Sequence, residues 1–412
     1  MFTPEPLSRE QHSRPAHNEL AVHWALKEDI VFLNHGSFGA CPLHVQQKRE
    51  DLLRWIESDP MEFMLNEYQP LLAFSIKRVT EFMGAQPGSV VFVENSTTGI
   101  NTILSNLPLD PGDEILVTDQ EYFSSANSLE VIARRRGAAV RLIHLPFPVE
   151  SPEEIIDAFA EAVSDSTKYA LIDHIVSSTG MIMPLKMIID TLSGNGVKTI
   201  VDGAHGPGQV PLNLKELGCF AYVGNCHKWL CSPRSSAALY VHPDFQDGFL
   251  PLVISHLPGD LETDLSDFQM YFRWNGTPDP TPALCVPESL KFMGDLNSSG
   301  WPGIMRSNRE KSLQARQILC TALEEEQPCP DSMVGAMAAI PLEGFNSSAF
   351  ALTHFTDPLQ QWLKNEKGIV VPITDLCNGA RRMVRISAQQ YNSIEQYHYL
   401  AEALVEYREK NY

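Results

Sequence analysis

The sequence predicts an α/β protein whose main part is a doubly wound, mostly parallel sheet. From about residue 89, short runs rich in β-branched residues alternate with longer amphipathic runs, as in a series of βαβ units. Several polar residues follow the predicted strands directly, and ligands collect at that edge of such a sheet. A chain of 412 residues is also too long for one simple core. We therefore expect a large sheet domain and a second, smaller domain.

The predicted strands and helices alternate along the central part of the chain. Strands are expected at residues 89–94, 113–118, 139–145, 168–174, 198–202, 219–223 and 237–242. Helices are expected at residues 98–107, 124–136, 152–164 and 185–194. Breakers such as Asp110-Pro111-Gly112 separate these units.

The pattern changes after about residue 285. A long helical stretch at 286–325 leads into a mixed segment of strands and helices that closes with a helix at 393–409. We expect residues 1–30 to form an arm that joins the small domain, residues 31–285 to form the large domain, and residues 286–412 to form the small α/β domain.

Composition indicates which classes of binding partner are excluded and in which cellular compartment we expect the protein. The net charge of −20 argues against nucleic acid or an anionic membrane surface as the main partner. No apolar run approaches the roughly 18 residues of a membrane helix, and the polar N-terminus lacks a signal sequence. The eight cysteines include no C-x-x-C pair, as expected of reduced thiols. We expect a cytoplasmic protein that binds no membrane.

Two residues on neighbouring loops indicate the chemistry. Asp202 ends an apolar predicted strand, and Lys228 follows in Asn225-Cys226-His227-Lys228. A lysine that can form a Schiff base and a carboxylate that keeps a pyridine nitrogen protonated are what pyridoxal 5'-phosphate requires. The segment 95–99, Asn-Ser-Thr-Thr-Gly, opens a predicted helix and so predicts a phosphate site. We expect pyridoxal 5'-phosphate as the cofactor and no metal ion.

The chain resembles the class V aminotransferase superfamily of fold type I pyridoxal phosphate enzymes, and within it the isopenicillin N epimerase-like branch. The matching blocks are Leu33-Asn34-His35-Gly36-Ser37-Phe38-Gly39, Asp59-Pro60-Met61-Glu62-Phe63, Asn95-Ser96-Thr97-Thr98, Asp119-Gln120-Glu121-Tyr122, Val201-Asp202-Gly203-Ala204-His205-Gly206-Pro207-Gly208, Gly224-Asn225-Cys226-His227-Lys228-Trp229, Trp274-Asn275-Gly276-Thr277-Pro278-Asp279, and Arg385-Ile386-Ser387 with Tyr391-Asn392.

The resemblance implies a set of cofactor-binding residues. Lys228 carries the cofactor and acts as acid and base, and Asp202 pairs with the ring nitrogen. Tyr122 stacks on the ring. The remaining implied cofactor contacts, with Thr277 reaching over from the second subunit of a homodimer, are Thr97, Thr98, His205, His227 and Thr277.

The resemblance also implies how an amino-acid substrate is held. Arg385 clamps the α-carboxylate, and Asn34 contacts the substrate. The form of the block around His35 is more similar to branch members that cleave carbon–sulfur bonds, including hercynylcysteine sulfoxide lyases, than to the epimerase. We therefore expect His35 to take part in catalysis.

Several reactions share the first step, loss of the substrate α-proton. We expect β-elimination at the Cβ–S bond of a cysteine-derived amino acid or its sulfoxide, with epimerisation as the alternative and transamination after it. A cysteine desulfurase would need a nucleophilic cysteine, for which Cys377 is the candidate.

A zinc-binding module is the alternative that involves no enzyme chemistry. Zinc could be held by donors at Cys219, Cys226, His227 and Cys231, although they lack paired C-x-x-C spacing.

Overall fold

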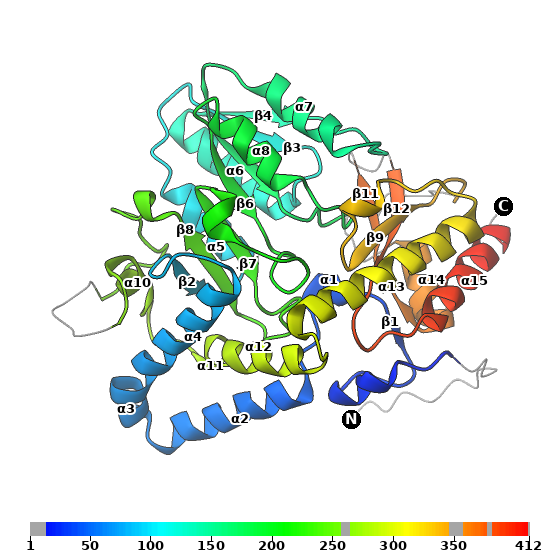
Figure 1. Ribbon diagram of the computed structural model, residues 1–412, viewed down its shortest axis with the longest axis horizontal. Helices are drawn as coiled ribbons and strands as arrows, with labels where there is room; N and C mark the ends of the chain where they lie inside the picture. The colour runs from blue at the N-terminus through cyan, green and yellow to red at the C-terminus, as the bar shows by residue number, and fades with distance from the viewer. Residues whose placement is uncertain (1–13, 257–263, 346–356, 377–380, 411–412) are drawn as a thin grey trace.

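A seven-stranded sheet forms the centre of the computed structural model, which describes residues 14–256, 264–345, 357–376 and 381–410. Its strand order is β2-β8-β7-β6-β5-β3-β4 (Figure 1). β8 pairs antiparallel with β2 and β7, and the other pairs are parallel. The bounds are β2 (Val90–Val93), β3 (Glu114–Thr118), β4 (Ala139–Ile143), β5 (Thr167–Asp173), β6 (Lys198–Asp202), β7 (Ala221–Asn225) and β8 (Ala237–Val241).

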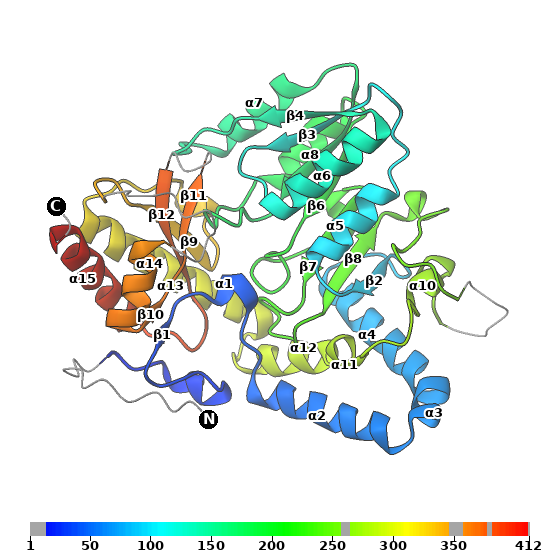
Figure 2. The ribbon, with the colours of Figure 1, turned by 180° about the vertical axis from the view of Figure 1, so that it is seen from behind.

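Two pairs of helices cover the two faces of this sheet. α5 (Ser96–Ser105) and α6 (Phe123–Arg136) lie in front of it in Figure 2, and α7 (Pro152–Ala162) and α8 (Leu185–Ser193) cover the other face. Side chains alternate along β3, because Ile115 packs in the cluster with α5 and α6 while Leu116 packs in the cluster with α7 and α8. This confirms the predicted doubly wound, mostly parallel sheet.

A second group of strands, from the C-terminal part and residues 31–32, forms two smaller sheets. One has the antiparallel order β11-β12-β9, and in the other β1 pairs parallel with β10. The strands are β1 (Val31–Phe32), β9 (Met337–Pro341), β10 (Ile369–Val370), β11 (Ile373–Leu376) and β12 (Arg381–Ser387).

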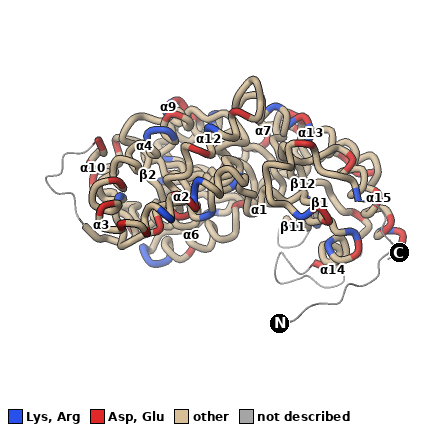
Figure 3. The backbone as a smooth tube through the Cα atoms, turned by 90° about the horizontal axis from the view of Figure 1, so that it is seen from below, with Lys and Arg blue, Asp and Glu red and all other residues tan. Residues whose placement is uncertain are grey.

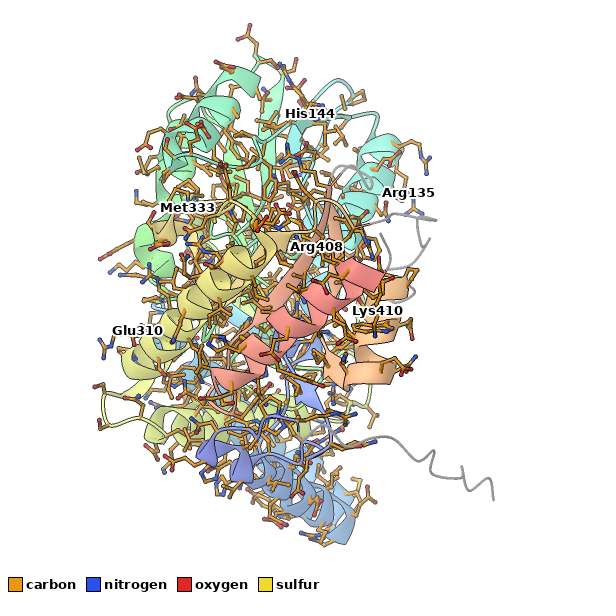
Figure 4. The ribbon with its side chains drawn as sticks, turned by 90° about the vertical axis from the view of Figure 1, so that its right-hand side faces the viewer. Arg135, His144, Glu310, Met333, Arg408 and Lys410 are labelled. Atoms are coloured by element: carbon orange, nitrogen blue, oxygen red, sulfur yellow. The ribbon has the colours of Figure 1, made fainter. Side chains whose placement is uncertain are left out.

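The first described residues, 14–23, lie beside these C-terminal strands in both ribbon views (Figures 1 and 2). The backbone N–H of Asn18 donates to the carbonyl of Tyr391 over 2.9 Å, and η1 (Glu19–His23) follows. The long helices of this region are α12 (Val286–Asp295), α13 (Gly300–Leu323) and α15 (Glu395–Lys410). α15, which carries Arg408 and Lys410, packs along α13 (Figure 4).

The remaining helices are mostly short. They are α1 (His35–Phe38), α2 (Leu43–Ser58), α3 (Pro60–Glu62), η2 (Phe63–Glu67), α4 (Tyr68–Phe82), α9 (Leu214–Leu217), η3 (Pro243–Phe245), α10 (Asp267–Phe272), α11 (Thr281–Leu284), η4 (Asp331–Met333), α14 (Pro358–Trp362) and η5 (Leu363–Lys367).

The long helical stretch predicted at 286–325 is confirmed, and the structure divides it into two helices, α12 and α13. The turn between them is closed by a bond from the N–H of Gly300 to the carbonyl of Asn297, and Gly300 has a φ of 63°. Glycine adopts this left-handed conformation readily, so the Asn-Ser-Ser-Gly run ends α12 and redirects the chain.

Within the described residues, no helix combines the length and apolarity needed to cross a bilayer. Acidic and basic residues are interspersed along the chain in Figure 3.

Candidate functional site

The candidate residues gather at the carboxyl ends of β7, β6, β5 and β3, which are neighbours in the sheet, and of β2, which runs in the same direction beyond β8. α5 begins after β2 and α6 after β3, and the last residues of β5, β6 and β7 are the polar residues Asp173, Asp202 and Asn225. The small sheet contributes Arg385 from β12.

Lys228 lies just after β7 and contacts a buried histidine. Its Nζ is 3.0 Å from Nε2 of His205. The indole N–H of Trp229 donates to Nδ1 of the same ring over 3.4 Å, which places the proton of the neutral imidazole on Nε2. Nε2–H can then donate to Nζ whenever the ε-amine is uncharged, because an ammonium group has no lone pair with which to accept. Burial, with the charge of Arg385, lowers the pKa of Lys228 to about 8.

Asp202 ends β6 and is almost fully buried. Its carboxylate accepts from Oγ of Ser125 over 2.7 Å and from the N–H of Ala204 over 3.0 Å. Burial raises the pKa of Asp202, while these two donors and the charge of Lys228 oppose the rise. The ε-amine and this carboxylate therefore lie close enough to interact electrostatically.

Two further carboxyl groups adjoin Asp202, and the sequence analysis assigned no role to either. Glu121 follows β3 and Asp173 ends β5, and ligand oxygens of the three residues all lie within 4.8 Å of one another. Burial and the neighbouring charges raise the pKa of Glu121 and Asp173 well above their usual values. Their positions at strand ends are the signal that could have identified them, since the same rule identified Asp202.

The start of α5 has the features of an anion site. The side chain of Asn95 accepts from the N–H of Thr98, and the side chain of Asn225 accepts from the N–H of Ser96, each over 2.9 Å. Oγ of Ser96 is buried without a hydrogen-bond partner among the described residues. Thr97 is exposed and Thr98 half-buried. Hydroxyl groups and the helix dipole thus meet at this end of α5.

The other predicted phosphate contacts lie near this helix or beside Lys228. Nδ1 of His227 donates to the carbonyl of Ser236 over 2.9 Å, and burial lowers the pKa of His227 to about 4. Thr277 is exposed and lines an open cavity together with Thr98.

Tyr122 stands at the N-cap position of α6, with its side chain 37% exposed. Its backbone N–H donates to Asp173 over 3.2 Å. Burial of the remaining phenol surface and the charge of Asp202 raise its pKa. The ring is therefore an accessible, neutral aromatic surface beside the carboxyl groups.

Arg385 is buried, and neighbouring oxygen atoms accept hydrogen bonds from some of its guanidinium N–H groups. Nη2 donates to Oδ1 of Asn34 and Oγ of Ser37, each over 3.0 Å, and Nη1 donates to the carbonyl of Ser177. Nε has no partner among the described residues. Burial lowers the pKa of Arg385 to about 10. A carboxylate that binds two N–H groups here must displace Asn34 or Ser37 from Nη2 or pair through Nη1.

His35 is fully buried, and both ring nitrogens have partners. Nδ1 lies 2.9 Å from the hydroxyl of Tyr391, and Nε2 lies 3.0 Å from the carbonyl of Lys228 and 3.2 Å from Nε2 of Gln389. Burial lowers its pKa to about 4. This neutral ring contacts the backbone of Lys228.

The segment that follows Asp202, residues 203–206, packs directly on a buried tyrosine. A Cβ added at Gly203 would lie 2.0 Å from the ring of Tyr222, and one at Gly206 would lie 1.9 Å from its hydroxyl. That hydroxyl also pairs with Nδ1 of His174 over 2.9 Å. Both positions therefore require glycine.

The donors suggested for zinc are not assembled in the described part of the chain. The group of three close metal-ligating side chains found there is Glu121, Asp173 and Asp202, which contains neither cysteine nor histidine. Cys377, the candidate desulfurase nucleophile, lies outside the described residues.

The chain belongs to the class V aminotransferase family, whose model matches residues 75–400. This family match and the fold confirm that the protein is an enzyme of that superfamily.

Among curated relatives, the chain is 32% identical to isopenicillin N epimerase of Amycolatopsis lactamdurans, over 94% of this chain and 99% of that protein. It is 30% identical to a probable chloroplastic L-cysteine desulfhydrase of Arabidopsis thaliana, over 91% of this chain and 82% of that protein. Among solved structures, a C-DES variant with glycine covalently linked to its pyridoxal phosphate cofactor has a TM-score of 0.80 at 19% identity, covering 94% of this chain and 99% of that one. This likeness confirms the fold type I architecture.

Proposed function

We propose that the protein is a pyridoxal 5'-phosphate-dependent lyase that cleaves the Cβ–S bond of a cysteine-derived amino acid or its sulfoxide. The observation that carries the proposal is the convergence of Lys228, Asp202 and Arg385 at one edge of the sheet. The 30% identical relative named as a cysteine desulfhydrase supports the reaction type.

The side chains present fit this cofactor. Lys228 offers an ε-amine whose lowered pKa favours the uncharged form, Asp202 offers a buried carboxylate for a protonated pyridine nitrogen, and Tyr122 offers an aromatic surface. The start of α5, with the unpartnered hydroxyl of Ser96 and the side chains of Thr97 and Thr98, suits a phosphate.

Three further residues complete the proposed cofactor site. His205 orients Nζ of Lys228 through the bond at 3.0 Å. His227 uses its Nδ1 proton on Ser236, so it donates from Nε2 to a phosphate when the ring is protonated, a form that a nearby phosphate dianion favours. Thr277 is the remaining phosphate contact.

When bound, the pyridine ring supplies a sink for the electron pair left at the substrate Cα. Arg385 binds the substrate α-carboxylate, displacing Asn34 or Ser37, and so fixes the Cα–H bond relative to Lys228. Nζ of Lys228 then removes the Cα proton, and the sulfur leaves Cβ with the bonding electrons. We infer that His35 acts indirectly, by holding the backbone carbonyl of Lys228.

Epimerisation of an amino-acid centre is the second candidate, favoured by the 32% identity to isopenicillin N epimerase. A panel of amino acids, cysteine conjugates and sulfoxides in deuterated water separates the two reactions. Pyruvate with ammonia and a thiol product supports the lyase. Deuterium at Cα with inversion supports the epimerase and contradicts the lyase, and conversion of the cofactor to its amine form would indicate transamination.

We also propose a homodimer, because exposed apolar side chains gather on α1 to α4, including Phe38, Met61, Leu65 and Phe74. Sedimentation analysis tests the dimer. We propose the domain limits 1–30, 31–285 and 286–412. The boundary at 285 is supported by the large sheet of β2 to β8 on one side and the sheet of β9, β11 and β12 on the other, while residues 31–32 pair with β10 of the small domain. We also propose a cytoplasmic location, supported by the seven unpaired cysteines of the described residues.

A further inference from the structure

We infer that Glu121 and Asp173 are neutral, protonated carboxylic acids that confine the single negative charge of their cluster to Asp202. We call Glu121, Asp173 and Asp202 the carboxyl triad. Glu121 and Asp173 then act as positioning residues for the carboxylate that faces the ring nitrogen. That purpose rests on the proposed function, whereas the protonation itself does not require a bound cofactor.

The triad is compact and shielded from water. Its three members come from the ends of β3, β5 and β6, and ligand oxygens from all three lie within 4.8 Å of one another. Glu121 is 8% exposed, Asp173 4% and Asp202 2%. Three negative charges in so small a buried volume would repel one another without solvent to screen them, so protons must neutralise some of them.

The hydrogen-bond donors show which member keeps the charge. Asp202 accepts two bonds, from Ser125 at 2.7 Å and from Ala204 at 3.0 Å. Asp173 accepts one longer bond, from the N–H of Tyr122 at 3.2 Å. Neither carboxyl oxygen of Glu121 has a hydrogen-bond partner among the described residues. Donors stabilise the ionised form, so Asp202 is the strongest acid of the triad and Glu121 the weakest.

The positively charged side chains near the triad do not neutralise its carboxyl groups in place of protons. Lys228 acts on Asp173 and Asp202 from after β7, and Arg385 acts on Tyr122 from β12, but no ion pair joins a described cation to the triad. Tyr122 and Tyr222 face the triad as neutral phenols, because burial raises the pKa of both.

The ionisation directions agree with this geometry. Burial, then the charges of Asp173 and Asp202, raises the pKa of Glu121 well above its usual value, against the opposing influence of the nearby N–H groups of Tyr122 and Asp173. Burial and the charge of Asp202 do the same for Asp173.

Protonation of Glu121 has a measurable effect on stability. Below the unfolded-state pKa of about 4.3, the folded and the unfolded chain both bind the proton, so this group does not make the free energy of unfolding depend on pH. Above it, the unfolded state releases the proton and the folded state keeps it, so folding becomes less favourable as pH rises towards the folded-state pKa. Glu121→Gln removes this penalty while keeping size and a donor group.

The test is thermal unfolding of the full, cofactor-loaded chain at several pH values from about 5 to 8. Glu121→Gln is compared with wild type and with Glu130→Gln, a control at an exposed position on α6. The melting temperature of Glu121→Gln relative to wild type should rise by roughly 1–3 °C per pH unit, and that of the control should stay flat. A difference that is flat, or that falls with pH, would overturn the inference.

Infrared spectroscopy tests the same point without reliance on stability. Wild type at neutral pH should show the carbonyl stretch of buried protonated carboxylic acids, and part of that band should disappear in Glu121→Gln and in Asp173→Asn. Absence of the band in wild type overturns the inference, as does a band unchanged in both variants.

Failure of the proposed function gives a different result. A wild-type chain that forms no borohydride-reducible link to the cofactor contradicts the proposed function, and the infrared band would persist. A normal cofactor link without the band contradicts only the triad.

Discussion

The acidic side of the site comes from the large sheet alone, whereas the basic side combines one residue of the large sheet with one of the small sheet. The acidic side, Glu121, Asp173 and Asp202, lies at the ends of strands inside the large sheet, whereas Lys228 follows β7 and Arg385 comes from β12 of the small sheet. Burial raises the pKa of every member of the acidic side and lowers the pKa of both cations. The pKa shifts on each side therefore favour the uncharged form, and within the part of the chain that the structure describes no salt bridge joins the three carboxyl groups to Lys228 or Arg385.

This difference shows what a ligand has to supply. A protonated ring nitrogen near Asp202 and a carboxylate near Arg385 would each provide the opposite charge that the site lacks. Substitutions on the two sides should therefore affect different steps.

The largest effect is expected for Lys228→Ala on the basic side. Without the ε-amine, the chain should form no borohydride-reducible link to pyridoxal phosphate, and turnover should fall by at least about 1,000-fold. Mass spectrometry after reduction measures the link. Lys215→Ala, at an exposed position on α9, is the matched control. A reducible link that persists in Lys228→Ala would show that another amine carries the cofactor.

Asp202→Asn tests the acidic side. The amide retains size but removes the charge expected at the ring nitrogen, so kcat should fall by about 100- to 1,000-fold. Cofactor release, followed by dialysis and absorbance, should be faster. Wild-type kcat in this variant would mean that the charge resides elsewhere in the triad.

Arg385→Ala separates substrate binding from cofactor binding. Loss of hydrogen bonds to a charged group should raise KM for the amino acid by about 10- to 100-fold, with cofactor affinity nearly unchanged. Arg381→Ala, at an exposed position of the same strand, serves as the control. An unchanged KM in Arg385→Ala would contradict the carboxylate clamp.

The pKa of Lys228 predicts a pH dependence. Only the uncharged amine reacts with an aldehyde, so the rate of pyridoxal phosphate attachment to the cofactor-free chain should rise about tenfold per pH unit below the pKa of about 8 and level off above it. Stopped-flow absorbance measures the rate. A rise that continues to pH about 10 would indicate an ordinary lysine.

The smallest effect is expected for Ser125→Ala. Its hydroxyl is the closest donor to Asp202, so its loss should raise the pKa of Asp202 and weaken cofactor affinity by about 3- to 10-fold. Equilibrium titration of the cofactor measures this change. Ser124→Ala, one residue earlier on the same helix, is the control, because Ser124 contributes only its backbone carbonyl to a bond from Ser128.

The sequence predicts the large sheet well because its strands are short, apolar and separated by amphipathic helices. The same pattern predicted Asp202 and Lys228 as site residues, because an acid and an amine that pyridoxal phosphate could use stand at or just after the ends of predicted strands. Glu121 and Asp173 were missed because the sequence does not reveal that β3, β5 and β6 are adjacent, with β5 between the other two.

The tertiary contacts of the histidines were equally inaccessible. The link from His35 to Lys228 spans 193 residues of chain, and nothing local predicts it. The helical stretch at 286–325 was predicted without its division into two helices, because apolar periodicity continues on both sides of a turn that only the Asn-Ser-Ser-Gly run marks.

The contact of Gly203 and Gly206 with Tyr222 has a consequence for engineering. Random libraries that aim to change substrate scope would lose their members at these two codons to misfolding before any selection for activity. Diversity should instead be concentrated at Asn34 and Ser37, whose side chains accept hydrogen bonds from Arg385.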